Sequence, residues 1–315
     1  TSIIEEEESD MNSGTTTDRA GARKGRGSIL LSLGLVLLGA CASMASAEKV
    51  LTIAYNEEPQ TSDMQMTTSC YLIPLNVYDR MVECVTTGPG KSAIVPGLAT
   101  KWEISKDGKV YTFHLRKGVK FHNGEELTAK DVVYTFDRML DPKTKALNTD
   151  LLDFVVGAPD RMSGKAASTS GLKALDKYTV QISLENSFVP FLAMMSTPQA
   201  SILNEKFTKP LANKYGLSAE NTCGTGPFIL KSWQPDQKMV LTRNPNWWNK
   251  SPETNVTEIV YTPVENVSTR MAALLSGEVD FVLDPSPQDL PRLRNNADLK
   301  VIDGVENRTI FFGMD

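Results

Sequence analysis

The chain has 315 residues, a formal net charge of −5, two histidines and four cysteines. Its length is typical of about two domains, and 23% charged with 41% hydrophobic residues is ordinary for a globular protein. The negative charge argues against a broad nucleic-acid surface. Two histidines leave little material for a His-rich metal site or a Ser-His-Asp triad, and four cysteines are too few for a disulfide-dense small domain. Composition therefore favours a large, acidic, non-enzymatic globular protein.

The first 47 residues are predicted to be a leader that contains a secretory signal peptide. Basic residues Arg23, Lys24 and Arg26 precede an uncharged apolar stretch over 28–40, and small residues follow it. At 1.5 Å per residue this stretch covers about 20 Å, which is short of a bilayer core of about 30 Å. The leader therefore predicts export and not a membrane span.

Two processing sites fit the end of this leader. Leu38-Gly-Ala-Cys41 resembles a bacterial lipobox, in which Cys41 becomes the lipidated first residue and anchors the protein to the membrane. Ala45-Ser-Ala47 instead fits the A-x-A rule and releases a free periplasmic protein that starts at Glu48. Both alternatives place the mature chain outside the cytoplasm.

Hydrophobic periodicity along the rest of the chain predicts a mixture of strands and helices. The predicted strands, in chain order, are 50–55, 102–104, 110–115, 178–184, 227–233, 238–243, 258–261, 279–282, 300–302 and 309–312. The predicted helices are 70–84, 128–140, 190–195, 203–215, 266–276 and 287–294. A connector is expected over 93–102, and the Gly/Ser/Ala-rich stretch 143–177 is expected to be a surface excursion. The fold class is therefore α/β with a mixed sheet.

Local signals support several of these elements. Asp107-Gly108 and Pro235-Asp236 are typical of hairpin turns. Thr128 followed by Asp131 resembles a capping box, and Gly277 fits the C-cap of the preceding helix.

The cysteines that remain after export are Cys70, Cys84 and Cys223. In one helix over 70–84, the first two would lie about 20 Å apart, which is too far for a disulfide. A disulfide would then need Cys223, and we predict the pair Cys84–Cys223. The alternative is three unpaired thiols.

Other candidate sites have weaker support. Gly224-Thr225-Gly226-Pro227 lacks the Gly-Lys-Ser/Thr and the following helix of a phosphate loop, so nucleotide binding is not expected. His114 and His122 lack the further donors that a metal ion requires, and no cofactor is expected. Trp247 and Trp248 are expected to be packing aromatics.

A long block of motifs resembles the extracytoplasmic solute-binding proteins of family 5, which serve peptide and nickel ABC importers. The block comprises Pro96-Gly-Leu-Ala-Thr-Lys-Trp102, Asp107-Gly-Lys-Val-Tyr-Thr-Phe-His-Leu-Arg116, Val119-Lys-Phe-His-Asn-Gly124 and Leu127-Thr-Ala-Lys-Asp-Val-Val-Tyr134. Further motifs are Gly224-Thr-Gly-Pro-Phe228, Arg243-Asn-Pro-Asn-Trp-Trp248 and Leu275-Ser-Gly-Glu-Val-Asp280. They occur in the family's order and span essentially all of 50–315.

The resemblance implies a periplasmic-binding-protein fold of type II, with mixed sheets and two lobes that enclose the ligand. Lobe one would be built from 48–85 and 218–284, and 86–217 would be an extra subdomain peculiar to the family. Residues 285–315 would begin lobe two, most of which would be missing from a chain truncated at its C-terminus. The acidic residue that pairs with a peptide's amino terminus in relatives would lie in that missing lobe.

The resemblance also implies ligand contacts in lobe one and in the subdomain. They map onto the loop Thr67, Thr68, Ser69, Cys70 and Tyr71, and less directly onto Asn148, Thr149 and Asp150. Hydroxyl and main-chain contacts suit sequence-tolerant recognition, because every peptide offers the same main-chain donors and acceptors. The alternative for 67–71 is a loop that only caps a helix.

The function that this resemblance implies is capture of a di- or oligopeptide and its delivery to an ABC permease of the inner membrane. The receptor is expected to be a monomer. A nickel chelate, haem, an opine or an oligosaccharide is an alternative solute. A secreted hydrolase and a truncated gene product that binds nothing are the alternatives of a different class.

Overall fold

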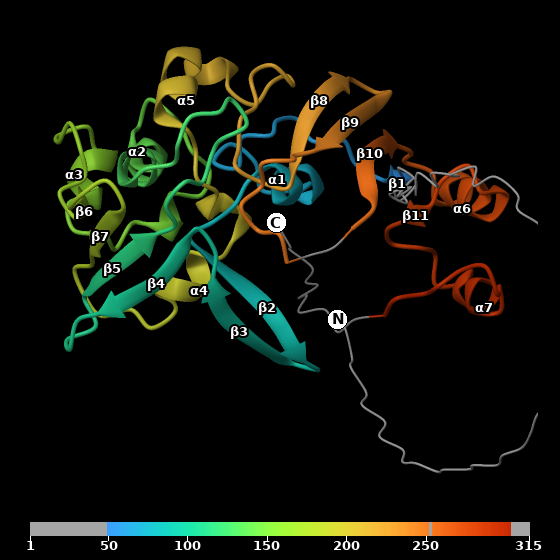
Figure 1. Cartoon of the computed structure of the whole chain (residues 1–315), viewed down its shortest axis with the longest axis horizontal. Helices are drawn as coiled ribbons and strands as arrows, with labels where there is room; N and C mark the ends of the chain where they lie inside the picture. The colour runs from blue at the N-terminus through green and yellow to red at the C-terminus, as the bar shows by residue number, and fades with distance from the viewer. Residues whose placement is uncertain (1–48, 252–253, 304–315) are drawn as a thin grey trace, which may run out of the picture. The chain divides into compact units, whose positions relative to one another are not determined.

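The computed structural model describes residues 49–251 and 254–303, which form a mixed α/β structure (Figure 1). The helices of this part are α1 (Leu72–Val77), α2 (Ala129–Leu140), α3 (Ala158–Met162), α4 (Phe191–Met194), α5 (Glu205–Leu211), α6 (Val267–Ser276) and α7 (Leu290–Arg294). Three short 3-10 helices are η1 (Thr149–Leu151), η2 (Pro198–Ala200) and η3 (Ala212–Lys214). Within the described residues, no helix combines the length and the apolar character that a membrane span requires.

A five-stranded mixed sheet has the strand order β11-β1-β10-β9-β8. Its strands are β1 (Lys49–Tyr55), β8 (Phe228–Gln234), β9 (Lys238–Arg243), β10 (Val256–Pro263) and β11 (Phe281–Val282). The second strand in this order, β1, is parallel to both of its neighbours, β10 and β11, whereas β8, β9 and β10 pair antiparallel. Of the apolar run at 50–55, Ile53 and Ala54 are buried, whereas Val50, at the start of the strand, is exposed.

A four-stranded antiparallel sheet has the order β4-β5-β7-β6. Its strands are β4 (Ala99–Ile104), β5 (Val110–Leu115), β6 (Leu172–Ala174) and β7 (Thr179–Ser183). In β5, the side chains of Tyr111, Phe113 and Leu115 are buried and those between them are half-buried, as the sequence alternation predicts. Helix α2 contacts β6 and β7, and its buried face joins the same core through Val132 and Phe136.

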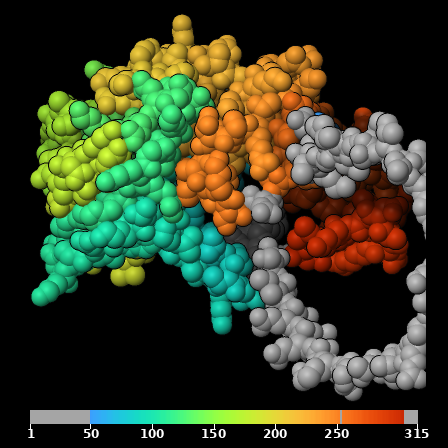
Figure 2. All heavy atoms as spheres, viewed as in Figure 1, coloured from blue at the N-terminus to red at the C-terminus, as the bar shows by residue number. Residues whose placement is uncertain are grey.

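A two-stranded hairpin, β2 (Val82–Gly88) with β3 (Lys91–Pro96), forms a sheet of its own. It projects at the surface in Figure 2, and most of β2 is exposed to solvent. This hairpin contradicts two sequence predictions. The helix over 70–84 is wrong beyond Val77, because Tyr78 is extended and the chain leaves the helix there. The connector over 93–102 is wrong because most of it lies in β3 and β4.

Two further predictions are wrong, and one falls outside the described residues. The stretch 143–177 is no surface excursion, because it sends apolar side chains into the core that α2 covers: Leu151, Leu152, Val155, Ala158 and Leu172. The Gly, Ser and Ala residues of this stretch are typical of a surface loop, but the apolar residues between them pack into the core. Residues 300–302 form no strand. The strand predicted at 309–312 lies outside the described residues.

The local signals for turns and caps are confirmed. Gly108 has a φ of +69° in the β4–β5 connection, and Asp236 has a φ of +58° between β8 and β9. The main-chain N–H and the hydroxyl of Thr128 both donate to Asp131 Oδ2, at 2.9 and 2.8 Å. Gly277 ends α6 with a left-handed φ of +78°.

The glycines of the 224–228 motif allow two main chains to touch. Gly226 N–H donates to Val77 O at 2.8 Å, just where α1 ends. A Cβ at Gly224 would lie only 2.0 Å from the same carbonyl oxygen. These glycines therefore serve close packing of the chain, and not a phosphate.

Replacing Gly224 by alanine should destabilise the fold by about 3 kcal/mol, because the new methyl group meets backbone that cannot move aside. The matched control is Gly88→Ala, where an added Cβ has no neighbour within 4 Å. Urea unfolding of both variants measures the difference. Equal midpoints for the two variants would contradict the close-packing role.

Candidate functional site

Residues 61–67, which we call the polar strap, lie between β1 and α1 in the chain. The side chains of Thr61, Ser62, Asp63, Gln65 and Thr67 are all buried. Buried polar groups are costly unless hydrogen-bonded, so the partners of this strap decide its position.

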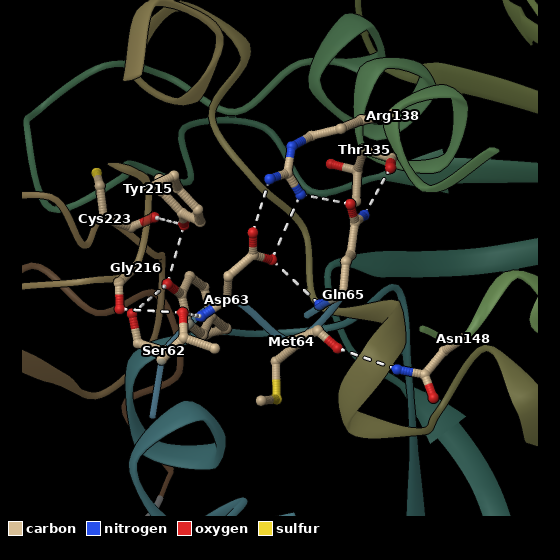
Figure 3. Close-up of polar contacts among 12 residues, drawn as sticks. Ser62, Asp63, Met64, Gln65, Thr135, Arg138, Asn148, Tyr215, Gly216 and Cys223 are labelled. Atoms are coloured by element: carbon tan, nitrogen blue, oxygen red, sulfur yellow. Dashed lines mark hydrogen bonds and ion pairs between the residues drawn. The ribbon is translucent and has the colours of Figure 1, made fainter. Parts of the chain in front are cut away.

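Helix α2 holds the strap through Arg138 (Figure 3). Arg138 Nη2 lies 2.6 Å from Asp63 Oδ2, and Nη1 donates to Gln65 Oε1 at 2.5 Å. Gln65 Nε2 in turn donates to the main-chain oxygen of Thr135, one turn earlier in α2. The carboxylate of Asp63 is 1% exposed and the guanidinium side chain of Arg138 is 11% exposed, so this is a buried ion pair with further hydrogen bonds.

Hydroxyl groups hold the strap on its other side. Ser62 Oγ lies 2.7 Å from Thr222 Oγ1, and Ser62 N–H donates to Gly216 O at 2.8 Å. The hydroxyls of Tyr78 and Tyr215 lie 2.9 Å apart, and burial raises the pKa of both phenols. The strap therefore connects α2 with the segment that precedes β8.

The strap leads into the predicted ligand loop, 67–71. Thr68 and Ser69 are exposed, Tyr71 is half-buried, and Thr67 and Cys70 are buried. Thr67 Oγ1 donates to Ser69 O at 3.0 Å, and Tyr71 Oη donates to Thr68 O at 2.6 Å. The carbonyls of Thr68 and Ser69 are thus bonded within the loop. The main-chain N–H groups of Thr68 and Cys70 have no acceptor among the described residues.

Of the predicted ligand contacts Asn148, Thr149 and Asp150, the first bonds this loop. Asn148 Nδ2 donates to Thr67 O at 3.1 Å and lies 3.5 Å from Met64 O (Figure 3 shows the latter contact). Thr149 and Asp150 form the first turn of η1, half-buried and exposed respectively, and no hydrogen bond joins them to the loop within the described part of the chain. The structure thus brings Asn148 to the loop and leaves Thr149 and Asp150 beside it in sequence only.

The loop lies by the carboxyl ends of the parallel strands β1 and β10. Burial, and then Glu57 and Glu58, raise the pKa of the Cys70 thiol to about 12. Cys70 also contributes to the raised pKa of Tyr55, at the end of β1, after burial as the main cause. Asn76 Nδ2 donates to Tyr261 Oη of β10 at 3.3 Å. Ligands of open α/β sheets bind at this kind of edge.

The cysteines of the described residues are all free thiols. Cys84 is exposed on β2, whereas Cys70 and Cys223 are buried. The predicted disulfide Cys84–Cys223 is therefore wrong for this structure. Its premise was a single helix over 70–84, which the strand β2 replaces. Cys41 lies outside the described residues.

The aromatic motif and the glycine motif meet at Asp79, a carboxylate that is 5% exposed. Trp248 Nε1 donates to Asp79 Oδ2 at 2.9 Å, and Thr225 Oγ1 donates to the same oxygen at 2.8 Å. Burial raises the pKa of Asp79, and these donors oppose that shift. The tryptophans are thus packing aromatics with a polar partner.

His122 is fixed in one tautomer between two glycines. Its Nδ1 accepts from Gly224 N–H at 3.3 Å, so Nε2 carries the proton and donates to Gly226 O at 3.1 Å. Within 49–251 and 254–303, no three His, Cys, Asp or Glu side chains gather as a metal ion would require.

The sequence did not indicate Asp63 or Arg138 as parts of this site. Asp63 and Arg138 are separated by 75 residues, and no local pattern links a loop carboxylate with a helix arginine at that distance. The sequence places Asp63 and Gln65 between the predicted strand 50–55 and the predicted helix 70–84, in a stretch rich in Thr and Ser that is typical of a loop.

Comparisons with known proteins agree on one family. A family model described as "Bacterial extracellular solute-binding proteins, family 5 Middle" matches residues 93–315. "Di/tripeptide-binding protein 4" of Pseudomonas aeruginosa is 32% identical, over 86% of this chain and 51% of its own length. "Dipeptide-binding protein" of Escherichia coli is 32% identical, over 87% and 52%. This chain therefore spans about half the length of these relatives.

The fold has solved counterparts as well. The substrate-binding domain of an oligopeptide ABC transporter from Bacillus anthracis superposes with a TM-score of 0.72 and 32% identity. The match covers 80% of this chain and 48% of that chain. The mixed α/β fold of the described residues is thus that of this class of periplasmic binding protein, over about half of such a chain.

The first prediction from the site concerns the buried ion pair. Arg138→Met should destabilise the protein by about 3–5 kcal/mol, because it leaves the Asp63 carboxylate buried without its cation. The control Arg294→Met breaks an exposed pair with Asp303 and should cost at most about 1 kcal/mol. Urea unfolding at pH 7 distinguishes the two, and similar losses in both variants would contradict the argument.

The second prediction concerns pH. Burial lowers the pKa of His122 to about 4, while its bond to Gly226 O opposes the shift. The unfolded histidine titrates near 6.5, so between pH 6.5 and 4 the unfolded chain binds a proton that the folded chain refuses. The free energy of unfolding should therefore decrease as the pH is lowered from 6.5 to 4, by up to about 3 kcal/mol.

Urea unfolding between pH 7.5 and 4.5 measures this slope, with His122→Asn as the reference that keeps an acceptor but cannot titrate. The other groups titrate alike in both proteins, so the difference isolates His122. Identical slopes would show that His122 does not carry the effect.

Proposed function

Because the chain belongs to the bacterial extracellular solute-binding proteins of family 5, we propose that it captures short peptides outside the cytoplasm for an ABC importer. The observation that supports this most directly is the ligand loop 67–71. It lies by the carboxyl ends of two parallel strands and leaves main-chain donors without an acceptor among the described residues. The names of the relatives, which are di/tripeptide- and dipeptide-binding proteins, support peptides as the solute.

The chemistry of the loop suits a peptide main chain. The N–H groups of Thr68 and Cys70 would donate to ligand carbonyls, and the exposed hydroxyls of Thr68 and Ser69 would both donate and accept. Such contacts recognise the backbone that all peptides share and tolerate different side chains. Thr149 and Asp150 would contribute at the edge of the site.

The domain organisation belongs to the same proposal. Strands of the five-stranded sheet come from 48–85 and 218–284, as proposed for lobe one, and those of the four-stranded sheet come from 86–217. A second lobe beginning near 285 would close over the peptide and pair with its amino terminus. Delivery to the permease, a signal peptide over 1–47, a lipid on Cys41 and a monomeric state complete the proposal.

Peptide binding can be tested by titrating peptides into the isotope-labelled chain and following its backbone amide signals. Pools of di-, tri- and octapeptides should shift the amides of 68–70. Affinity should be weak, on the order of millimolar, since one side of the peptide is contacted. The amides of the β2–β3 hairpin serve as the internal reference and should stay in place.

The alternative solutes are tested in the same experiment. A nickel chelate, haem, an opine and an oligosaccharide should each leave the amides of 68–70 unchanged. If one of them moves these signals and no peptide pool does, peptides are not the solute. Cleavage of the added peptides, seen by mass spectrometry, would instead indicate a hydrolase.

A further inference from the structure

We propose that Asn148 is a positioning residue for peptide binding, which aims the Thr68 N–H at the ligand while making no contact with the ligand itself. This inference rests on the proposed function of the loop 67–71. It assigns a task to the section 86–217, from which Asn148 comes.

The first step is the direct hold on the loop. The side-chain amide of Asn148 donates to Thr67 O at 3.1 Å and lies 3.5 Å from Met64 O, so it contacts two main-chain oxygens three residues apart. The preceding residue adds a main-chain bond, from Leu147 N–H to Gln65 O at 2.9 Å. The main chain of Asn148 is itself held, because its main-chain oxygen accepts from Leu151 N–H where η1 begins.

The second step follows from the geometry of the peptide bond. The carbonyl of Thr67 and the N–H of Thr68 belong to one planar peptide unit. No peptide bond in the described residues is cis, so these two groups point in opposite directions. A donor that fixes the Thr67 oxygen therefore also fixes the direction of the Thr68 N–H, which points away from Asn148.

The third step is that the next peptide unit is held separately. Gln199 Nε2 of η2 donates to Tyr71 Oη at 2.9 Å, and Tyr71 Oη donates to Thr68 O at 2.6 Å. Both chains of hydrogen bonds begin in the section 86–217 and end on adjacent loop carbonyls. The loop is thus fixed before a ligand arrives, which reduces the entropy lost on binding.

The test uses two variants that remove the donor in different ways. Asn148→Ala deletes the side-chain amide, and Asn148→Asp keeps its size but presents only acceptors to the two carbonyls. Each should weaken peptide affinity about fivefold, the worth of one hydrogen bond. Each should also shift the Thr68 amide signal of the ligand-free protein and raise its mobility in ¹⁵N relaxation.

Asn204→Ala is the matched control, because it removes an asparagine from the same section that caps α5 through Phe207 N–H at 2.8 Å. It should lower the melting temperature without changing the Thr68 signal or peptide affinity. If the Asn148 variants behave like this control, the positioning role is wrong. If the unaltered chain binds no peptide, the proposed function is wrong. If the Thr68 amide signal is unchanged in the Asn148 variants, the positioning role is wrong whether or not peptides bind.

Discussion

The position of the candidate site depends on a buried ion pair between a loop and a helix, Asp63 with Arg138. Removing two charges from water is costly, and the pair is retained only because each charge has additional hydrogen-bond partners. Gln65 bonds the guanidinium and also the main chain of α2, and Thr61 and Ser62 extend the contacts to the far side. These contacts fix the position of the strap, and the strap in turn fixes where the predicted ligand loop begins.

The motif residues that indicate the family pack and form hydrogen bonds in the structure around the candidate site. The glycines of 224–228 let the chain touch the end of α1, His122 bonds both of them, and Trp248 closes over Asp79. None of these groups is exposed in the loop that we assign to the ligand. A motif with glycine, histidine and tryptophan suggests chemistry in isolation, whereas here each residue type meets a packing or hydrogen-bonding need.

The proposal of a peptide receptor rests on family membership and on the chemistry of one loop. Membership of the family comes from sequence similarity over most of this chain, and the loop has exposed hydroxyls of the kind that would bond a peptide main chain. The described part has sheets from two sections of the chain, and contacts from one section, through Asn148 and Gln199, fix a loop in the other. Recognition of a common backbone needs donors of fixed direction more than it needs particular side chains.

The sequence by itself determined the α/β class, most strands and helices, the turns at Gly108 and Asp236, and the cap at Thr128. These depend on local periodicity and backbone preference, which neighbouring residues carry. The loop 67–71 as a candidate site came instead from the resemblance to the family. Only the tertiary structure decided that 82–88 is a strand, that 143–177 enters the core, and that Cys84 and Cys223 stay unpaired. It also placed Asp63 on Arg138 and Asn148 on Thr67. Such contacts join residues about 75 or more positions apart, so the packing of the whole chain, and no local pattern, selects them.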